Sequence, residues 1–232
     1  MKFETLRELN AERAARRPAI VVTDTQTGEQ RLVKARDFAA DPLRVELSRQ
    51  LRMGKSGTIE ANDRKLFLNV YAPTARMVIV GAVHISQALA PLARSRDYDV
   101  AVVDPRTAFA SPERFPDVPL IAEWPDVALP PLNIDHYTAF VALTHDPKID
   151  DPALLHAFER DCFYIGALGS RKTHAKRAER LKAQGAKDGD IERIHAPIGL
   201  SIGAVSPSEI AVAIMAEITA QLRLPREKEA AA

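Results

Sequence analysis

The chain has 232 residues, which suffice for one well-buried core and a smaller second domain. Its 32 lysine and arginine residues nearly balance its 31 aspartate and glutamate residues, so the overall charge favours neither nucleic acid nor a membrane surface as a partner. A single cysteine, Cys162, excludes an intrachain disulfide and a cysteine-rich zinc site. The charged N-terminus and the lack of a long apolar run predict a cytoplasmic protein that does not enter a membrane.

Residues 1–72 are expected to form a small α+β domain. Leucines at helical spacing, and apolar runs separated by small polar residues, predict two helices and two strand pairs. The helices are expected at 3–16 and 36–53, and the strands at 19–23, 30–33, 56–60 and 65–71. Pro18 and Gly54 are placed to end the helices, and Pro73 marks the boundary of the domain.

Residues 73–224 alternate apolar runs with amphipathic stretches, which predicts an α/β domain with a Rossmann-like, mainly parallel sheet and helices on both faces. The strands are expected at 77–81, 99–103, 119–121, 139–143 and 162–166, and the helices at 84–95, 152–160, 170–184 and 207–222. The last helix carries a full N-terminal capping signal, made by Ser206, Pro207 and Glu209. The proline-rich stretch 112–131 is expected to be irregular apart from its short strand, and the tail 225–232 to be disordered.

The first candidate ligand site is the turn after the first strand of this sheet, because ligands of open α/β sheets bind beyond the carboxyl ends of the strands. Gly81 ends that strand, and His84 falls in the first turn of the next helix, where its ring can donate to a phosphate or pack. Val83 and Ser86 occupy the places of the second and third glycines in the G-x-G-x-x-G motif of dinucleotide-binding proteins. The turn is therefore predicted to suit a phosphate-bearing ligand but to hold NAD poorly.

The second candidate is the end of the next strand, which carries Asp104 and Arg106. Asp104 lies where dinucleotide-binding folds place the acid that binds a ribose, although an aspartate at a strand end can also cap a turn. Arg106 can pair with a phosphate through two parallel hydrogen bonds. Both residues are predicted to face a phosphorylated ligand.

Two further strand ends carry polar groups. Thr144, His145 and Asp146 can donate, accept or move a proton, but no histidine pair or cysteine cluster accompanies them, so a metal site is not expected. The other strand end offers an anion backbone N–H groups, a hydroxyl and a cation, through Gly166, Gly169, Ser170 and Arg171. Because its spacing is not that of a Walker motif, ATP hydrolysis is not predicted.

Three features leave alternatives open. The stretch 170–187 has seven lysines and arginines against one glutamate, so it is either a solvated helix face or a docking surface for an acidic partner. Gly199 and Gly203 precede the last helix, where they can let the backbone close over a ligand or make a tight loop. Cys162 is expected to be a packed thiol, because the amino ends of the strands lie opposite the binding edge.

Six of these stretches occur in order along the chain: GAVHISQAL from Gly81, VDPR from Val103, RFP from Arg114, THDPK from Thr144, YIGALGSRK from Tyr164 and APIGLSIGA from Ala196. As a set they resemble the XdhC/CoxI family over most of 77–222. The resemblance implies an accessory protein of xanthine dehydrogenase or carbon monoxide dehydrogenase. Such proteins bind the molybdenum cofactor, hold it while a cysteine desulfurase installs its sulfido ligand, and deliver it to the apo-enzyme.

The chain departs from the family pattern in two places. Val83 stands where many members have a glycine, and the small domain lacks the Gly-Ser-Ser-Pro-Arg stretch that many members carry. The implied delivery role therefore depends on the C-terminal domain. A molybdopterin has one terminal phosphate and a flat polar pterin, so it needs an anion site and hydrogen-bonding strand ends more than a wide gap for a pyrophosphate.

Three hypotheses follow. The first is a non-catalytic chaperone that binds molybdenum cofactor (molybdopterin) and assists its sulfuration and its insertion into apo xanthine dehydrogenase or a related molybdenum hydroxylase. The second is an NAD(P)-dependent oxidoreductase in which Asp104 or Arg106 selects the ribose and His145 is the acid or base. The third is a cofactor-free protein-binding adaptor that docks through 170–187.

The predicted site lies where two glycine-ended turns, at Gly81 and Gly169, are expected side by side around a hollow lined by positive and polar groups. Its predicted cofactor-binding residues are Gly81, Val83, His84, Asp104, Arg106, Thr144, His145, Gly166, Gly169, Ser170 and Arg171. A homodimer is a further expectation, because the small domain has little core of its own.

Overall fold

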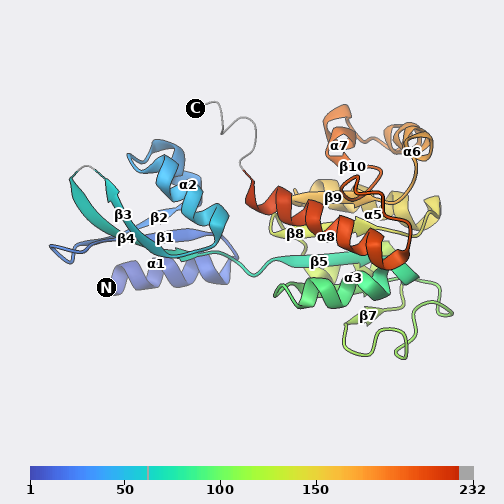
Figure 1. The fold of residues 1–232 in the computed structure, drawn as a ribbon, viewed down its shortest axis with the longest axis horizontal. Helices are drawn as coiled ribbons and strands as arrows, with labels where there is room; N and C mark the ends of the chain where they lie inside the picture. Colours follow the sequence, from blue (N-terminus) through green and yellow to red (C-terminus); the bar gives the residue numbers. More distant parts are fainter. Residues whose placement is uncertain (62, 225–232) are drawn as a thin grey trace. The chain divides into compact units, whose positions relative to one another are not determined.

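The structure, a computed structural model, describes residues 1–61 and 63–224. The disorder predicted for 225–232 concerns residues outside that part of the chain. Two compact units are present among the described residues, one formed by Met1–Pro73 with Arg223 and Leu224 and the other by Thr74–Leu222. Each unit is built around its own sheet (Figure 1).

The first unit contains a four-stranded antiparallel sheet in the order β2-β1-β4-β3. Its strands are β1 (Ala19–Asp24), β2 (Gln30–Lys34), β3 (Gly57–Ala61) and β4 (Arg64–Tyr71). Alternate residues of β1 enter different cores, because successive side chains of a strand point to opposite faces. Ile20 and Val22 pack with Leu47 of α2 (Arg44–Met53), whereas Val21 packs with Leu9 of α1 (Phe3–Ala14). The sheet is therefore covered on both faces.

The prediction of a single helix over 36–53 is wrong, because two separate helices occupy this stretch. A 3₁₀ helix, η1 (Ala35–Ala40), ends before Asp41, and α2 begins only at Arg44. Pro42 disfavours a helical conformation in the residue before it, and Asp41 is extended, with ψ 138°. The Asp41 carboxylate then accepts a hydrogen bond of 2.9 Å from the N–H of Leu43. Leucine spacing continues across this break, which hides it in the sequence.

The second unit contains a six-stranded sheet in the order β10-β9-β8-β5-β6-β7, with every neighbouring pair parallel. Its strands are β5 (Arg76–Val80), β6 (Asp99–Val103), β7 (Leu120–Ile121), β8 (Thr138–Ala142), β9 (Tyr164–Ala167) and β10 (Ile194–His195). The chain moves outward from β5 through β6 to β7, and then returns to place β8 on the other side of β5. This is the strand order of a Rossmann sheet, with its reversal between β5 and β8.

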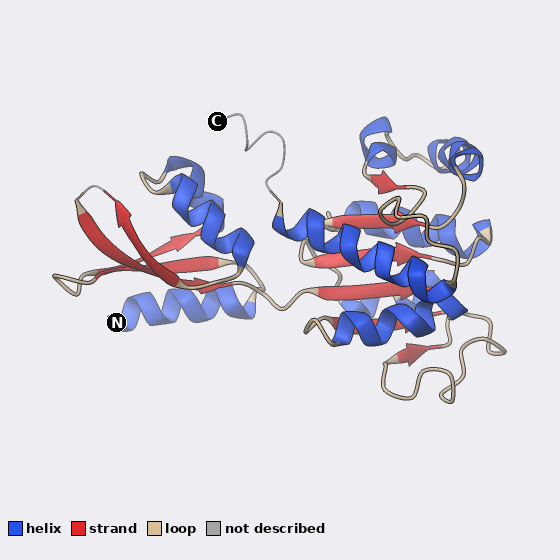
Figure 2. Cartoon of the chain, viewed as in Figure 1, coloured by secondary structure: helices blue, strands red, loops and turns tan. Residues whose placement is uncertain are grey.

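Helices cover both faces of this sheet, which confirms the predicted α/β class. On one face α3 (His84–Arg94) and α8 (Pro207–Arg223) pack against side chains of β5, β6 and β8, with Leu89 and Ile214 at the centre of the core. Figure 2 shows α8 crossing the front of the sheet. On the other face α5 (Pro147–Glu159) and α6 (Arg171–Ala183) pack through Leu154 and Leu181.

The capping signal predicted for the last helix is confirmed. The backbone N–H of Ser206 donates to Glu209 Oε2 at 2.8 Å, and the N–H of Glu209 donates to Ser206 Oγ at 3.3 Å. Pro207 is the first residue of α8. Three local residues therefore fix where α8 starts, at the carboxyl edge of the sheet.

Other boundaries were predicted incorrectly. The helix expected at 152–160 begins earlier, at Pro147, because Asp146 caps it by accepting a hydrogen bond of 3.0 Å from the N–H of Lys148. The irregular stretch 112–131 contains the expected strand β7 but also a short helix, α4 (Pro125–Ala128). Helix α7 (Asp188–Glu192) and strand β10 were not predicted. These elements are two to five residues long, too short for periodicity to reveal.

Candidate functional site

The candidate site is the carboxyl edge of the large sheet where β5 and β8 lie next to each other. From β5 the chain turns into α3 on one face, and from β8 it turns into α5 on the other face. The two connections therefore part at this point, and a crevice beyond such diverging connections is where open α/β sheets bind ligands.

The glycine turns at Gly81 and Gly169 both contact the loop that follows β8. A Cβ atom on Gly81 would lie 2.9 Å from Thr144 Cγ2 and 3.2 Å from the Thr144 nitrogen, and the φ of Gly81 is +114°. A Cβ atom on Gly169, whose φ is +135°, would lie 3.7 Å from His145 Cε1. The two turns do not lie directly side by side as predicted, because β8 separates β5 from β9, and the 143–146 loop contacts both turns.

Asp104 and Arg106 form a closed pair at the end of β6. Asp104 is fully buried, and its Oδ1 accepts from the N–H and the Nε of Arg106, both at 2.9 Å. Its Oδ2 accepts from the N–H of Ala82 at 2.8 Å and from Arg106 Nη2 at 2.7 Å. Burial acts to raise the pKa of Asp104, but the hydrogen bonds from Arg106 and Ala82 outweigh it, so the pKa lies below its ordinary value. Arg106 was predicted to pair with a phosphate through two parallel hydrogen bonds, but in the structure it makes this pair of bonds with Asp104.

The outer side of Arg106 lies against an aromatic ring. The guanidinium carbon of Arg106 is 4.5 Å from the ring centre of Phe109, which is itself exposed. Arg114 holds this loop in place by donating from Nη1 to the carbonyls of Ala82 and Phe109, at 2.9 and 2.8 Å. Arg106 Nη1 has no hydrogen-bond partner among the residues that the structure describes, so it can still donate to an anion.

The loop after β8 is organised by Asp150, a buried residue of α5. Asp150 Oδ1 accepts from Thr144 Oγ1 at 2.6 Å, and Asp150 Oδ2 accepts from the N–H of His145 at 3.0 Å. Thr144 Oγ1 in turn accepts from the N–H of Asp146 at 3.0 Å. His145 has a left-handed backbone, with φ 62°, and its side chain is exposed. The loop is therefore rigid beneath a ring that faces solvent.

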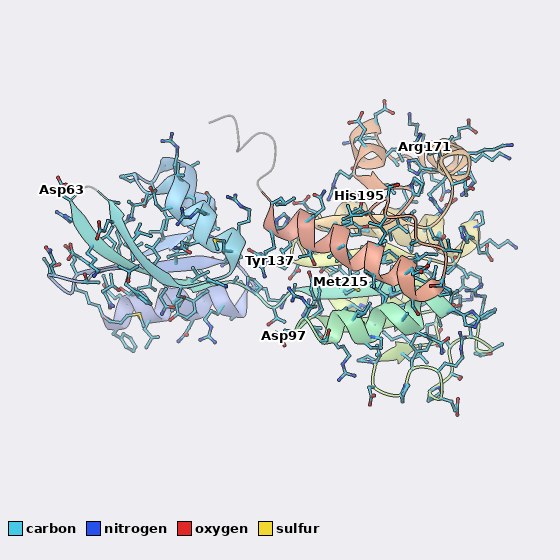
Figure 3. The ribbon with its side chains drawn as sticks, in the orientation of Figure 1. Asp63, Asp97, Tyr137, Arg171, His195 and Met215 are labelled. Carbon is cyan, nitrogen blue, oxygen red and sulfur yellow. The ribbon has the colours of Figure 1, made fainter. Side chains whose placement is uncertain are left out.

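The basic helix α6 is only partly a solvated face. Arg177 is buried, and its Nη2 donates to the carbonyl of Leu168 at 2.8 Å. Arg180 is bonded to Asp151 of α5, with Nε 2.6 Å from Oδ2. Among the cations of α6, Arg171 and Lys172 at its start are exposed near the binding edge. Figure 3 labels Arg171 at this end of α6.

The helices that start at the site, α3 and α6, are capped differently. Val83 is the residue before α3, and it offers no side-chain hydrogen bond to the first N–H groups of that helix. Ser170 precedes α6, and its Oγ accepts from the N–H of Thr173 at 3.2 Å. No side chain therefore caps the N–H groups at the start of α3, and both helix starts carry a partial positive charge. His84, the first residue of α3, is exposed beside them.

Gly166 lies inside β9, where it makes room for the loop before α8. A Cβ atom there would be 2.5 Å from Ile198 Cδ1. That loop is held by Glu217 of α8, whose Oε2 accepts from Tyr164 Oη at 2.5 Å and from the N–H of Gly199 at 2.8 Å. The ring of His195, labelled in Figure 3, stacks on Tyr164 and places Nδ1 3.1 Å from Glu217 Oε1. Burial opposes ionisation of Glu217, but the hydrogen bonds from His195 and Tyr164 leave its pKa below the ordinary value.

Ten of the eleven predicted site residues lie on the four connections that follow β5, β6, β8 and β9, whereas Gly166 lies within β9 and makes room for Ile198. Sequence reasoning missed three buried or half-buried residues that hold loops by hydrogen bonds. Asp150 holds the 143–146 loop, Arg177 holds the turn after β9, and Glu217 holds the loop before α8. One signal for Arg177 was present, because it lies four residues before the buried Leu181 and so shares its helix face.

Three observations concern the described chain outside the candidate site. Cys162 is buried as predicted, and burial raises the pKa of its thiol to about 12. Within residues 1–61 and 63–224 no group of three or more histidine, cysteine, aspartate or glutamate side chains could hold a metal ion. No helix in the described part of the chain has the length and apolar character needed to cross a membrane.

The chain is similar to several known proteins. It is 32% identical over 155 residues to the uncharacterized protein YqeB of Escherichia coli, and the match covers 66% of this chain and 28% of that protein. It is 32% identical to a probable xanthine dehydrogenase subunit of Bacillus subtilis, over 66% of this chain and 44% of that one. It is 31% identical to the molybdenum cofactor insertion chaperone PaoD of E. coli, over 68% and 43%. The chain therefore spans less than half the length of these relatives.

A solved structure has the same fold. The crystal structure of a xanthine dehydrogenase from Bacillus halodurans aligns with a TM-score of 0.65 and 24% identity, covering 97% of this chain and 65% of that one. The XdhC Rossmann domain family matches residues 77–218, which include β5 except for Arg76, all of β6 to β10 and every residue of the candidate site. The chain therefore belongs to the XdhC family.

Proposed function

We propose that this chain binds molybdenum cofactor at the carboxyl edge of β5, β6, β8 and β9 and holds it for insertion into a xanthine dehydrogenase-type molybdenum hydroxylase. The observation that carries the proposal is the convergence of three loops at the reversal of strand order, in a domain of the XdhC family. One of the similar proteins is named a molybdenum cofactor insertion chaperone.

The residues at this edge fit a ligand with one phosphate. The start of α6 offers backbone N–H groups next to the exposed Arg171, and the start of α3 offers N–H groups that no side chain caps. Arg106 adds a guanidinium that Asp104 and Phe109 hold in one orientation. Fixed donors of this kind lose little conformational entropy when a ligand binds.

The same edge also offers groups to a flat polar ring. His145 is exposed on a rigid loop, and its neighbour Thr144 has its hydroxyl engaged by Asp150. Phe109 is 40% exposed beside Arg106, so it presents a ring face or edge on which a pterin can stack. The cofactor is cargo in this proposal, and the chain itself performs no covalent step on it.

The partners we propose follow from this cargo. A molybdenum hydroxylase in its cofactor-free form would receive the cofactor, and a cysteine desulfurase would supply the sulfur for its sulfido ligand while the cofactor is held. We propose a cytoplasmic location on the same ground. The exposed start of α6, with Arg171 and Lys172, is a surface that an acidic partner can contact next to the bound cargo.

The alternative of an NAD(P)-dependent oxidoreductase has less support from the site. It requires the Asp104 carboxylate to accept hydrogen bonds from a ribose. Each of the two oxygens already accepts two hydrogen bonds, from Ala82 and Arg106, and the side chain is fully buried. A ribose would have to displace Arg106 to reach it.

Retention of the cofactor by purified protein tests the proposal. The protein is loaded anaerobically with molybdenum cofactor, separated from free cofactor, and assayed for bound pterin by fluorescence after oxidation. We expect about one pterin per chain for the unchanged protein. The double variant Arg106→Gln with Arg171→Gln should lose more than tenfold in affinity, because each charge-assisted hydrogen bond contributes about 1.5–3 kcal/mol.

The matched control is Arg96→Gln with Arg160→Gln. These two arginines are exposed, as Arg171 is, but they follow the ends of α3 and α5 at the amino edge of the strands. The control should retain as much pterin as the unchanged protein. Equal retention by both double variants, or no retention by the unchanged protein, contradicts the proposal.

A further inference from the structure

Asp150 and Arg177 form a buried pair of opposite charges directly beneath the candidate site. Asp150 comes from α5 and Arg177 from α6, and their side chains are 1% and 2% exposed. Asp150 Oδ2 lies 3.8 Å from Arg177 Nη2, which is too long for a hydrogen bond but close enough for strong Coulomb attraction at a buried position.

Each member of the pair holds a different loop of the site. Asp150 accepts from the Thr144 hydroxyl and from the N–H of His145, so it fixes the loop after β8. Arg177 donates to the carbonyl of Leu168, so it fixes the turn after β9 that continues into Gly169. These are the two segments that meet at His145 and Gly169.

Packing alone does not account for an arginine at position 177. Its Nε and Nη1 are buried and have no hydrogen-bond partner among the described residues. Buried donors without a hydrogen-bond partner destabilise a fold, and an aliphatic side chain of similar length would avoid this loss of stability. The neighbouring carboxylate of Asp151 is already bonded to Arg180, so Asp150 is the closest available counter-charge.

We propose that Asp150 and Arg177 are positioning residues that set the separation of the 143–146 loop and the 168–170 turn. Attraction between the two buried charges holds α5 and α6 close to each other. Each side chain is also hydrogen-bonded to one loop and so fixes the position of that loop. The loops then present their donors to one ligand at a fixed spacing. The consequence for cofactor affinity rests on the proposed function, whereas the coupling between the loops does not.

Amide hydrogen exchange in the cofactor-free protein tests the coupling. Asp150→Asn and Arg177→Gln preserve most of the side-chain volume but remove one charge each. Exchange is followed at His145 and Leu168, relative to the core amide of Val141 in β8. We expect each substitution to accelerate exchange in both loops by at least tenfold beyond any change at Val141.

Arg180→Gln is the matched control, because it removes another arginine of α6 that pairs with α5, through Asp151. It should leave the relative exchange at His145 and Leu168 unchanged. Arg177→Lys keeps the positive charge but removes the guanidinium that donates to Leu168, so it should accelerate exchange at Leu168 more than at His145. If Arg177→Gln does not fold, Asp150→Asn decides the question through its effect on exchange at Leu168, in the turn that Asp150 does not touch. Effects confined to the loop that each residue touches would overturn the proposal.

Cofactor affinity gives the second measurement. Asp150→Asn and Arg177→Gln should each weaken binding of molybdenum cofactor at least tenfold, and the double variant should be no weaker than the weaker single variant. A double variant whose loss of affinity equals the product of the two single losses would mean that the two residues act independently. If the unchanged protein binds no cofactor, the proposed function fails, while the exchange measurement still decides whether the pair couples the loops.

Discussion

Two aspartate–arginine pairs lie at the carboxyl edge of the large sheet, one beside β6 and one beneath the loops after β8 and β9. In the first pair Asp104 accepts four hydrogen bonds, and Arg106 reaches the surface with its side chain 30% exposed. In the second pair both Asp150 and Arg177 are buried, the charges are 3.8 Å apart, and Nε and Nη1 of Arg177 have no hydrogen-bond partner among the described residues. The first arrangement presents a cation to solvent, whereas the second holds backbone segments in place.

The pKa values of the two aspartates reflect this difference. Burial acts on both carboxyl groups to raise the pKa, but hydrogen bonds from Arg106 and Ala82 bring that of Asp104 below its ordinary value. For Asp150 burial prevails over the hydrogen bonds from Thr144 and the charge of Arg177, so its pKa is raised. A buried pair can thus organise a site without being a strong source of stability.

The largest expected effect is the loss of stability in Asp150→Ala, which is compared with Asp104→Ala. Asp150→Ala should lower the free energy of unfolding by about 3–5 kcal/mol, because Arg177 is left as an uncompensated buried charge. Asp104→Ala should cost less, about 2–3 kcal/mol, because Arg106 can turn toward water while a few donors lose their acceptor. Urea denaturation measures both. A larger loss for Asp104→Ala would reverse the contrast between the two pairs.

The next effect concerns the turn that touches the 143–146 loop. Gly81→Ala should destabilise the protein by about 3 kcal/mol, because it combines backbone strain at a positive φ with a Cβ atom 2.9 Å from Thr144 Cγ2. Gly185→Ala is the control, since Gly185 has a φ of +98° but no atom within 4 Å of the added Cβ. It should cost about 1 kcal/mol from strain alone. Equal losses would show that Thr144 can yield and that the contact is not tight.

The stability contributed by Asp104 and that contributed by Asp150 should change with pH in opposite directions. Since the folded pKa of Asp104 is lowered, its contribution is present above the unfolded value of about 3.9 and is lost as pH falls through the folded value. Since that of Asp150 is raised, its folded state binds more protons, and stability falls as pH rises above the unfolded value.

Unfolding measured from pH 2 to 7 checks this prediction. The destabilisation caused by Asp104→Asn should shrink toward low pH. Asp150→Asn should instead become less unfavourable, relative to the unchanged protein, as pH rises above about 4. Shifts in the same direction for both variants would contradict the assignment.

The smallest expected effect tests the two helix starts. Ser170→Ala should cost about 1 kcal/mol, because α6 loses its N-cap. Val83 packs against the core, so Val83→Ser is compared with Val83→Ala, which loses the same packing, and the serine variant should be the more stable by up to about 1 kcal/mol because it supplies a cap for α3. Thermal unfolding detects both changes. Equal stability of the two Val83 variants would contradict the availability of the first N–H groups of α3.

The sequence was sufficient wherever structure is set by local contacts. The capping box at Ser206 and Glu209, the strand that ends at Gly81 and the parallel sheet all follow from neighbouring residues and periodicity. The break at Pro42 was missed because leucine spacing continues through it. The early start of α5 was missed although Asp146 and Pro147 form a cap and first-turn signal.

The supports of the site were not predictable in the same way. Asp150 lies in an acidic stretch and Arg177 in a basic one, and composition describes both stretches as solvated. Their roles depend on the packing of α5 against α6 and on contacts with Thr144 and Leu168. Such contacts join residues that only the folded chain brings together.

Hydrogen exchange of the cofactor-loaded protein tests the central claim most directly. Exchange in the loaded and cofactor-free protein is compared along the whole chain. We expect slower exchange at the three strand-end segments 81–85, 144–146 and 169–172, with no change at the amino edge near Arg96 and Arg160. Protection confined to the first unit, or to the amino edge of the large sheet, would contradict the claim that the carboxyl edge binds the cofactor.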